Sequence, residues 1–316
     1  MTFLLTGPIR HLAIAAGWIL GVRTRDVHRA PTPRVGGVAM LGGLLAAFLV
    51  TQHLPTFQAA PNLQDFRTIL SGAAIVWLAG VVDDRVGLSA FAKVGAQLAA
   101  AGVMSYQGLT IVWLPIPGVG IVTLNPSLST LVTLLALLVA INAVNFIDGL
   151  DGLAAGTSGI AAAASFLYSY RLWFGHGMEA AAPAAVTLVI VMGVCVGFLV
   201  HNAYPARIFM GDSGAMLLGL LLAGACISFL GQTDPDALAH ELSSEQRAAS
   251  SEQRAERSAN LDAIVLSPIF ADGDFNATHC RSNLGDNKTH LAWTISLRRR
   301  SRPLASPSSA HRKLAP

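Results

Sequence analysis

Residues 128–152, LSTLVTLLALLVAINAVNFIDGLDG, join a long apolar run directly to a cluster of amides and carboxylates. The run from Leu128 to Phe146 is rich in Leu, Val and Ala and has no alternation of apolar and polar residues. A membrane-spanning helix needs roughly 17 to 25 mostly apolar residues, because the hydrocarbon layer is about 30 Å thick and each helical residue rises about 1.5 Å. The stretch therefore predicts a transmembrane helix that ends in polar residues at the water boundary.

The whole chain has the composition of an integral membrane protein. Of its 316 residues, 53% are hydrophobic and 12% are charged, and the mean hydropathy is +0.55. Long apolar runs without period-two alternation suit helices and exclude a lipid-facing β-barrel. The predicted spans are Phe3–Leu20, Gly36–Thr51, Thr68–Val82, Phe91–Tyr106, Leu128–Phe146, Ala154–Leu172, Ala184–His201 and Ala215–Leu230. We therefore predict an all-α fold, a polytopic membrane helix bundle with about eight visible transmembrane helices.

Basic residues and turn residues predict how these helices are oriented. The loop from Gly21 to Arg34 carries four arginines, and by the positive-inside tendency it is cytoplasmic. The stretch from Leu109 to Leu124 contains two prolines and two glycines, so we predict an excursion on the outer side rather than a helix. Counting spans on this basis brings all the polar motifs of the chain to the cytoplasmic face.

Four polar motifs lie at the ends of the apolar runs. They are Pro31–Gly37 (PTPRVGG), Asp83 and Asp84 with Lys93, Asn142–Asp151 (NAVNFIDGLD), and Asn202–Gly214 (NAYPARIFMGDSG). Ionised carboxylates at a membrane boundary are costly unless they face water, a metal or a basic partner, so the adjacent aspartates indicate a functional site or a solvated helix cap. Neighbouring carboxylates can hold Mg²⁺ beside substrate phosphates. Lys93 could neutralise a diphosphate or simply extend its ammonium to the interface.

The third motif carries two amides and two carboxylates at every third position, which would align them along one side of a helical turn as a pocket wall. These residues are Asn142, Asn145, Asp148 and Asp151; the alternative is a helix terminus rich in Asn and Asp. In the fourth motif, Asp212 adds another carboxylate, although it or Ser213 could serve as a helix N-cap. In the first motif, Arg34 could bind phosphate, or the segment could be only a turn.

Taken together, the motifs resemble those of the polyprenyl-phosphate N-acetylhexosamine-1-phosphate transferases, which include the phospho-MurNAc-pentapeptide translocase. The resemblance runs from about Thr6 to Leu230 and is carried by PTPRVGG, VVDDRVGLSAFAKVGAQ, NAVNFIDGLDGLA and FLVHNAYPARIFMGDSG. The sequences of these motifs are most similar to those of the bacterial undecaprenyl- or decaprenyl-phosphate GlcNAc-1-phosphate transferase branch. The resemblance implies a multi-pass protein of the bacterial cytoplasmic membrane. Its expected reaction moves a sugar-1-phosphate from a UDP-N-acetylhexosamine to a polyprenyl phosphate and releases UMP, as the first lipid-linked step of cell-envelope polysaccharide synthesis.

The same resemblance implies roles for individual residues and a divalent cofactor, Mg²⁺ or Mn²⁺. The expected catalytic residues are Asp83, Asp84 and Asp148, with the adjacent aspartates activating the lipid phosphate. The expected metal ligands are Asp212 and Asp83. The expected substrate-binding residues are Lys93, Asn142, Asn145, Asp151, Asn202 and Arg34.

Other functional classes remain as alternatives. A transporter could also place carboxylates in membrane helices, but would favour positions near mid-membrane and paired repeats. An isoprenoid transferase would want two DxxxD-type clusters, whereas the chain has only DD and DGLD. The net charge of +3 is too small to indicate nucleic-acid binding. The GxxxG patterns at Gly17–Gly21 and Gly193–Gly197 permit a homodimer.

The C-terminal part departs from the family pattern. We predict a membrane-embedded transferase domain at 1–230, a polar linker with a repeated SSEQRA at 231–260, and an atypical disordered tail at 261–316. Family members have ten or eleven spans and a His-rich HxHH-type motif, whereas His279, His290 and His311 stand singly. We hypothesise that a frameshift or misprediction replaced the family's C-terminal part, in which case the chain would be an inactive homologue.

Overall fold

The structure is a computed structural model that describes residues 1–18, 32–53, 64–118, 120–175 and 177–230, with parts of 243–254. The chain divides into two compact units, Met1–Ser251 and Glu252–Pro316. In the second unit the described residues are 252–254, which are helical. The predicted tail at 261–316 and most of the predicted linker lie outside the described residues, so both stay predictions.

Each of the predicted spans overlaps a helix in the first unit, which confirms the all-α fold class; the first, Phe3–Leu20, is helical as far as Ala15. The helices are α1 (Thr2–Ala15), α2 (Gly36–Thr51), α4 (Gln64–Val86), α5 (Ala90–Tyr106), α6 (Pro126–Ile147), α7 (Leu153–Tyr170), α8 (Ala182–Asn202) and α9 (Gly211–Leu230). A short π-helical turn, η1 (Arg171–Gly175), follows α7, and a 3₁₀ turn, η2 (Glu179–Ala181), leads into α8. The start of α6 is defined by its sequence. The Asn125 side chain caps the helix by accepting a hydrogen bond from the Leu128 amide, and Pro126 is the first helical residue.

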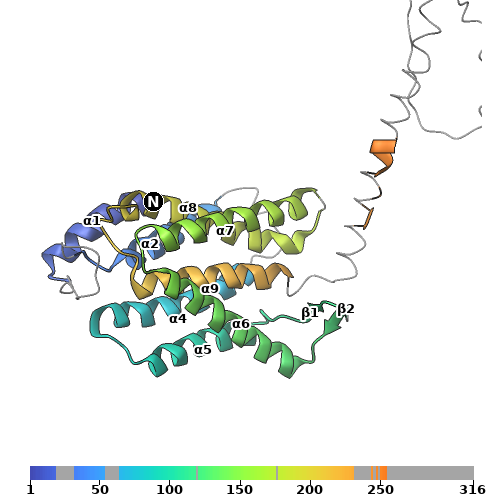
Figure 1. Cartoon of the computed structure of the whole chain (residues 1–316), viewed down its shortest axis with the longest axis horizontal. Helices are drawn as coiled ribbons and strands as arrows, with labels where there is room; N and C mark the ends of the chain where they lie inside the picture. The colour runs from blue at the N-terminus through green and yellow to red at the C-terminus, as the bar shows by residue number, and fades with distance from the viewer. Residues whose placement is uncertain are drawn as a thin grey trace, which may run out of the picture. The chain divides into compact units, whose positions relative to one another are not determined.

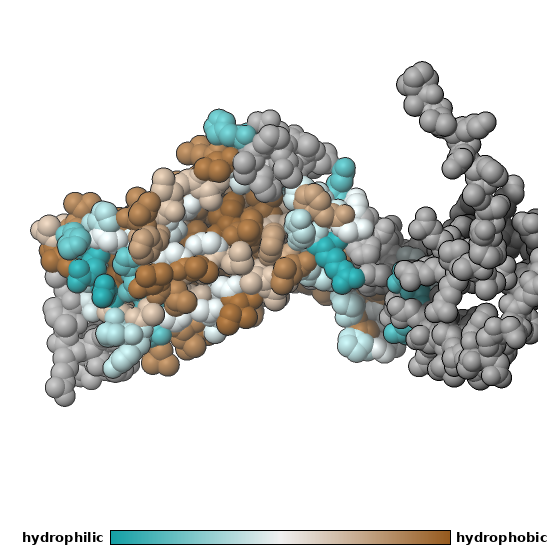
Figure 2. Space-filling view, turned by 90° about the horizontal axis from the view of Figure 1, so that it is seen from above, coloured by the Kyte–Doolittle hydropathy of each residue, from teal (hydrophilic) through white to brown (hydrophobic). Residues whose placement is uncertain are grey.

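Among the described helices, four are long and apolar enough to cross a membrane, fewer than the eight spans predicted. They are the helices at Gln64–Val86, Pro126–Ile147, Glu179–Asn202 and Gly211–Phe229, and α2 is a shorter apolar helix. The exposed face of α6 fits lipid, because Leu131, Leu135 and Val139 are exposed at a spacing of four residues along one side. Figure 2 shows apolar residues over much of the visible face, with polar residues gathered toward its ends.

Helix α9 is the inner helix of the unit. It contacts α2, α4, α6, α7 and α8, and Figure 1 shows it between α4 and α7. Its side chains from Ala215 to Leu218 are fully buried. Helix α9 begins at Gly211, within the fourth polar motif. Its position inside the bundle therefore places this motif among the ends of the neighbouring helices.

The Leu109–Leu124 stretch is not helical, as predicted. It forms a hairpin of β1 (Trp113–Ile116) and β2 (Gly120–Thr123), paired antiparallel from Trp113 with Thr123 to Ile116 with Gly120. The hairpin is tied to α6, because the Ser129 hydroxyl donates to the Ile111 carbonyl over 2.7 Å. It therefore lies at the N-terminal end of α6, opposite the end that carries NAVNFID.

Candidate active site

Three helices bring their polar residues together at one cation. The Lys93 Nζ of α5 lies 2.6 Å from Asp83 Oδ2 of α4 and 2.5 Å from Asp212 Oδ2 of α9. The side chain of Asp83 is 10% exposed, that of Lys93 26% and that of Asp212 29%. We call these three residues the Lys93 cluster. The prediction that motifs far apart in the sequence meet at one place is confirmed for them.

A short turn between α4 and α5 brings Lys93 back to Asp83. Gly87 adopts a positive φ of 73°, which favours glycine, and Asp83 Oδ1 accepts a 2.6 Å hydrogen bond from the Leu88 amide. Ser89 then caps α5 by accepting from the Ala92 amide. The chain reverses within these residues, so the first turn of α5 lies beside the last turn of α4.

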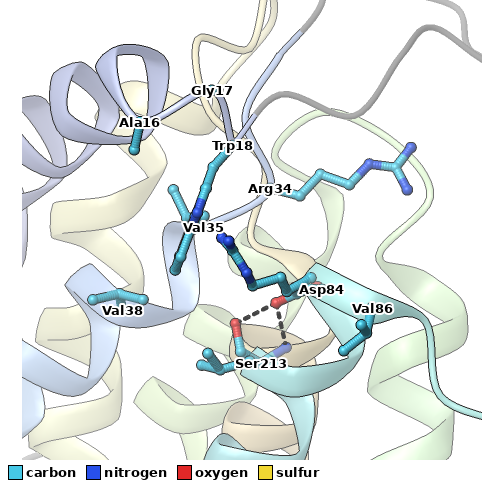
Figure 3. Close-up of a pocket in the computed structure, with 11 residues that line it drawn as sticks. Ala16, Gly17, Trp18, Arg34, Val35, Val38, Asp84, Val86 and Ser213 are labelled. Carbon is cyan, nitrogen blue, oxygen red and sulfur yellow. Dashed lines mark hydrogen bonds between the residues drawn. The ribbon is translucent and has the colours of Figure 1, made fainter.

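Asp84 is engaged differently from its neighbour. Its Oδ1 accepts from the Asp212 amide over 2.8 Å, and its Oδ2 accepts from the Ser213 amide over 3.1 Å and the Ser213 hydroxyl over 2.6 Å. Figure 3 shows the contacts between Asp84 and Ser213 as dashed lines. The first amides of a helix have no partners within the helix, and a carboxylate in this position accepts hydrogen bonds from them. The negative charge of the carboxylate is also stabilised by the positive end of the helix dipole. Asp84 on α4 thus caps α9 and fixes the turn that carries Asp212.

Very close packing holds these helix ends in register. A Cβ on Gly80 would overlap the backbone of Ser213, and a Cβ on Gly37 would overlap Ser213 and the Gly214 amide. The backbone of the PTPRVGG motif pairs with that of the fourth motif, because the Phe209 amide donates to the Pro33 carbonyl and the Gly36 and Gly37 amides donate to Phe209 and Met210, each over 2.9 Å. Sequence reasoning assigned PTPRVGG to phosphate or a turn and missed this pairing, which joins residues far apart in the chain.

The predicted helical stripe in NAVNFIDGLD is wrong in its second half. Helix α6 ends at Ile147, Asp148 is its C-cap residue, and a turn follows to Gly152, whose φ is +69°. Within the helix, Asn142 turns toward α5 and donates to Gln97 Oε1 over 2.7 Å. Gln97 is 1% exposed and also contacts the Met216 sulfur. Asn142 therefore links α6 to α5 beneath the Lys93 cluster, while Asn145 is half-buried on the last turn of α6.

Asp151 and Asn202 hold two loops together. The Asp151 Oδ2 accepts from the Ala206 amide over 2.9 Å. Asn202 is 2% exposed; its Oδ1 accepts from the Gly152 amide over 3.1 Å, and its Nδ2 donates to the Ile208 carbonyl over 3.0 Å. Both ends of the Asn202 side chain are thus satisfied by backbone. Direct contact of either residue with a substrate stays a prediction.

Asp148 shares the electrostatics of the site. Burial raises the pKa of Asp148 to about 7, the negative charges of Asp212 and Asp84 add to the increase, and the positive charge of Arg34 opposes it. A carboxyl group with a pKa near neutrality can both hold and release a proton under physiological conditions, as acid–base chemistry requires. The turn after α6 therefore brings a titratable group within electrostatic reach of the aspartates on α4 and α9.

Two carboxylates of the site, those of Asp83 and Asp212, suit a hard divalent cation such as Mg²⁺. Asp83 and Asp212 offer the oxygen ligands that Mg²⁺ prefers, and Mg²⁺ commonly uses one or two protein carboxylates with substrate phosphates. Their converging oxygens bind the Lys93 ammonium in this structure. Among the described residues, no group of three or more His, Cys, Asp or Glu side chains is arranged to hold a metal. The residues therefore fit a metal whose other ligands come from water and substrate.

Comparison with known proteins agrees with these motifs. Residues 66–230 match the family model described as glycosyl transferase family 4. The chain is 40% identical over 241 residues to the decaprenyl-phosphate N-acetylglucosaminephosphotransferase of Mycobacterium tuberculosis. This alignment covers 75% of this chain and 60% of the relative. The enzyme of the same name from Mycolicibacterium smegmatis is also 40% identical, and the alignment covers 75% of this chain and 59% of the relative.

A second group of relatives carries another name. The phospho-N-acetylmuramoyl-pentapeptide-transferase of Mycobacterium avium is 33% identical over 267 residues, with 72% of this chain and 73% of the relative covered. The chain spans about 60% of the length of the decaprenyl-phosphate relatives. The matched region runs from the first turn of α4 to the end of α9 and includes every residue of the Lys93 cluster. The chain therefore belongs to glycosyl transferase family 4, the polyprenyl-phosphate N-acetylhexosamine-1-phosphate transferases that its motifs resemble.

Proposed function

We propose that the chain transfers N-acetylhexosamine-1-phosphate, specifically GlcNAc-1-phosphate, from a UDP-sugar to decaprenyl or undecaprenyl phosphate and releases UMP. The observation that carries the proposal is the Lys93 cluster, in which two carboxylates and one ammonium from three helices meet at the helix ends. Its chemistry suits a reaction between phosphates, and the names of the decaprenyl-phosphate relatives give the sugar and the acceptor. The product would begin the lipid-linked assembly of a cell-envelope polysaccharide.

The reaction needs charge neutralisation and alignment more than covalent chemistry. An oxygen of the lipid phosphate forms a bond to the β-phosphorus of the UDP-sugar, and the bond from that phosphorus to the bridging oxygen breaks, so that UMP leaves with the electron pair. Lys93 would place positive charge against the diphosphate. Asp148 would hold or release a proton beside the reacting phosphates, because its pKa lies near neutrality.

We propose Mg²⁺ or Mn²⁺ as the cofactor, with Asp212 and Asp83 as its protein ligands. When bound, the metal supplies positive charge that polarises the phosphoryl oxygens. Lys93 would supply a second positive charge for the substrate phosphates. Asp84 would act on this arrangement through α9, because its carboxylate fixes the turn that presents Asp212.

The cytoplasmic face is the proposed side of the site. A nucleotide sugar is a cytosolic substrate and a polyprenyl phosphate is a membrane lipid, so the reaction needs a position where water and lipid meet. The acidic residues of the spanning helices α4 and α9 lie in their terminal turns, which supports a transferase over a transporter with carboxylates at mid-membrane. A homodimer remains part of the proposal only through the GxxxG patterns in the sequence.

The test is release of UMP from UDP-GlcNAc by purified membranes that contain the chain, with undecaprenyl phosphate and Mg²⁺. We expect release from the wild type and loss of release in Asp212→Asn and after chelation. Asp65→Asn is the matched control, because Asp65 lies at the other end of α4, where it accepts from the Ser228 hydroxyl. No release from protein shown to be inserted and folded would contradict the proposal.

A further inference from the structure

Helix α5, at the edge of the bundle in Figure 1, reaches the inner helix α9 through long side chains. The Lys93 ammonium contacts Asp212 of α9. One helical turn further along both helices, the Gln97 Nε2 donates to the Met216 sulfur over 3.4 Å. Because both contacts advance by four residues together, α5 and α9 run in the same direction and in step. The position of Lys93 therefore depends on how α5 is rotated and placed along α9.

A hydrogen bond to α6 makes this placement directional. The Asn142 Nδ2 donates to Gln97 Oε1 over 2.7 Å and to the Leu138 carbonyl of its own helix over 2.8 Å. Because Asn142 is the donor, the Gln97 amide turns its oxygen toward α6 and its nitrogen toward α9. Hydrogen bonds hold only within a narrow range of distance and angle. Gln97 therefore fixes the rotation of α5 against two helices at once.

Helices α6 and α9 form a fixed reference for this contact. A Cβ built on Gly219 of α9 would lie 2.7 Å from the Ile141 Cα of α6, so the two backbones are already in close contact. Met104 of α5 also lies against α9, but a methionine is flexible and fits many positions. The polar contacts of Gln97 therefore supply a register that apolar contacts of α5 do not specify.

Gln97 is buried at a cost in free energy. Its side chain is 1% exposed, and a buried amide is costly unless it is fully hydrogen-bonded. Its oxygen has a good donor, whereas its nitrogen meets sulfur, which is a weak acceptor. An apolar side chain would avoid this cost, and the best-attested use of a single buried polar residue between helices is to specify their register. The burial of Gln97 thus indicates a role in placing α5 rather than in stability.

We propose that Gln97 is a positioning residue for the transfer reaction, which sets α5 so that the Lys93 ammonium contacts both carboxylates of its cluster. The inference rests on the proposed function and adds a residue to that site without placing it against a substrate. Gln97 lies one turn along α5 from Lys93, on the same face, and Met216 lies one turn along α9 from Asp212. The contact made by Gln97 therefore acts directly beneath the ion pair.

The kinetic test is a double-mutant cycle on the kcat of UMP release. Gln97→Met removes the amide and nearly keeps the side-chain length, and we expect kcat to fall about tenfold or more because Lys93 is displaced. In the Lys93→Met background the same change should alter kcat by less than about twofold, because the residue through which Gln97 acts is gone. Gln107→Met is the matched control, since the Gln107 Nε2 also joins α5 to another helix, by a 3.1 Å bond to the Ser71 hydroxyl of α4, but at the other end of α5.

Three kinetic results would overturn the inference. An unchanged kcat in Gln97→Met would show that the amide is dispensable. An equal fold loss with and without Lys93 would show a general effect on the fold. An equal loss in Gln107→Met would show that any broken contact of α5 has the same effect. Gln97→Leu repeats the cycle with a stiffer apolar side chain, so that a Met variant that does not fold leaves the inference open to refutation.

A distance measurement tests the placement of α5 without any activity. Spin labels are attached at Phe91→Cys on the first turn of α5 and Phe146→Cys on the last turn of α6, with the three native cysteines replaced by serine. The two phenylalanines are 91% and 87% exposed, so the labels disturb little packing. We expect electron–electron double resonance in detergent to give one narrow distance distribution with Gln97 or with Gln107→Met, and a shifted or broader one with Gln97→Met.

The two measurements separate this inference from the proposed activity. An unchanged distance distribution in Gln97→Met would refute the placement of α5 by Gln97, even where the wild type releases UMP. A changed distribution, together with no UMP release from folded wild type, would contradict the proposed function and support the placement of Lys93 by Gln97.

Discussion

Lys93 is the residue on which the charge balance of the site depends. Its ammonium contacts Asp83 and Asp212, which would otherwise face each other as two partly buried carboxylates. Coulomb repulsion between like charges is stronger in such surroundings than in water. In the proposed reaction the same ammonium would also meet the phosphates of the substrate.

Replacing Lys93 with Met is expected to lower kcat about a hundredfold or more, the scale seen when one charge-stabilising group is removed from a phosphoryl or acyl transfer site. Lys93→Arg should retain part of the activity because it keeps the charge but changes its shape. UMP release by both variants and by the distant control Arg67→Met is the measurement. Full activity in Lys93→Met would remove this residue from the mechanism.

Asp148 gives the protein a defined pH dependence. Its pKa is raised from 3.8 to about 7 in the folded chain, so the folded state holds a proton that the unfolded state has lost between these values. Stability contributed by this proton is therefore present below about pH 4 and lost as the pH rises through about 7. Asp148→Asn should abolish this dependence, because an amide stays neutral.

Thermal unfolding in detergent at several pH values checks this expectation. The difference in Tm between Asp148→Asn and wild type should grow in favour of the variant as the pH rises from about 4 to above 7. Glu179→Gln, measured over the same range, reports the effect of neutralising an exposed acidic residue away from the site. A constant difference for Asp148→Asn would mean that its pKa is not raised.

At the level of helices, the start of α9 depends on contacts from α2 and α4. Asp84 caps the helix across the interface, and Gly37 and Gly80 allow the backbones to approach Ser213. None of these residues needs to touch a substrate in order to place Asp212. The motifs therefore contain residues that act on the site by holding its helices together.

Gly80→Ala is expected to destabilise the protein by about 1–3 kcal/mol, because the added methyl group overlaps backbone atoms of Ser213. Asp84→Ala should cost about 1–2 kcal/mol through loss of the cap on α9. Gly95→Ala on α5 is the control, since nothing lies within 4 Å of a Cβ built there. Chemical denaturation in mild detergent measures all three, and equal stability of Gly80→Ala and Gly95→Ala would refute the packing argument.

For the molecule as a whole, α6 separates two faces. The β-hairpin lies at its N-terminal end, and Asp148 with the Lys93 cluster lies toward its C-terminal end. At about 1.5 Å per residue, the 22 residues of α6 are long enough to cross the hydrocarbon layer. The hairpin and the site should therefore open to opposite sides of the membrane.

Cysteine labelling in intact cells tests this orientation. In a background with the three native cysteines replaced by serine, Pro117→Cys in the hairpin should react with a membrane-impermeant maleimide added outside. Ser89→Cys, at the start of α5, should react only after the membrane is opened. Labelling of both positions from the same side would refute the assignment of the site to the cytoplasmic face.

Much of this architecture could be predicted from local sequence. Long apolar runs predicted the α-helices of the described bundle, the prolines and glycines of Leu109–Leu124 predicted a break, and four motifs predicted the family. These features depend on residues close together in the chain. The helical stripe from Asn142 to Asp151 was wrong because spacing alone cannot show where a helix ends, and α6 ends at Ile147.

Only tertiary packing decided which polar residues meet. Lys93 and Asp212 are 119 positions apart, and Asp84 and Ser213 are 129 apart, so no local pattern specifies their contacts. Two adjacent aspartates with the same propensities consequently have different partners: Asp83 binds an ammonium and Asp84 caps a helix. Their divergence follows from the burial of α9 among its neighbours, which places a helix start over one carboxylate and a lysine over the other.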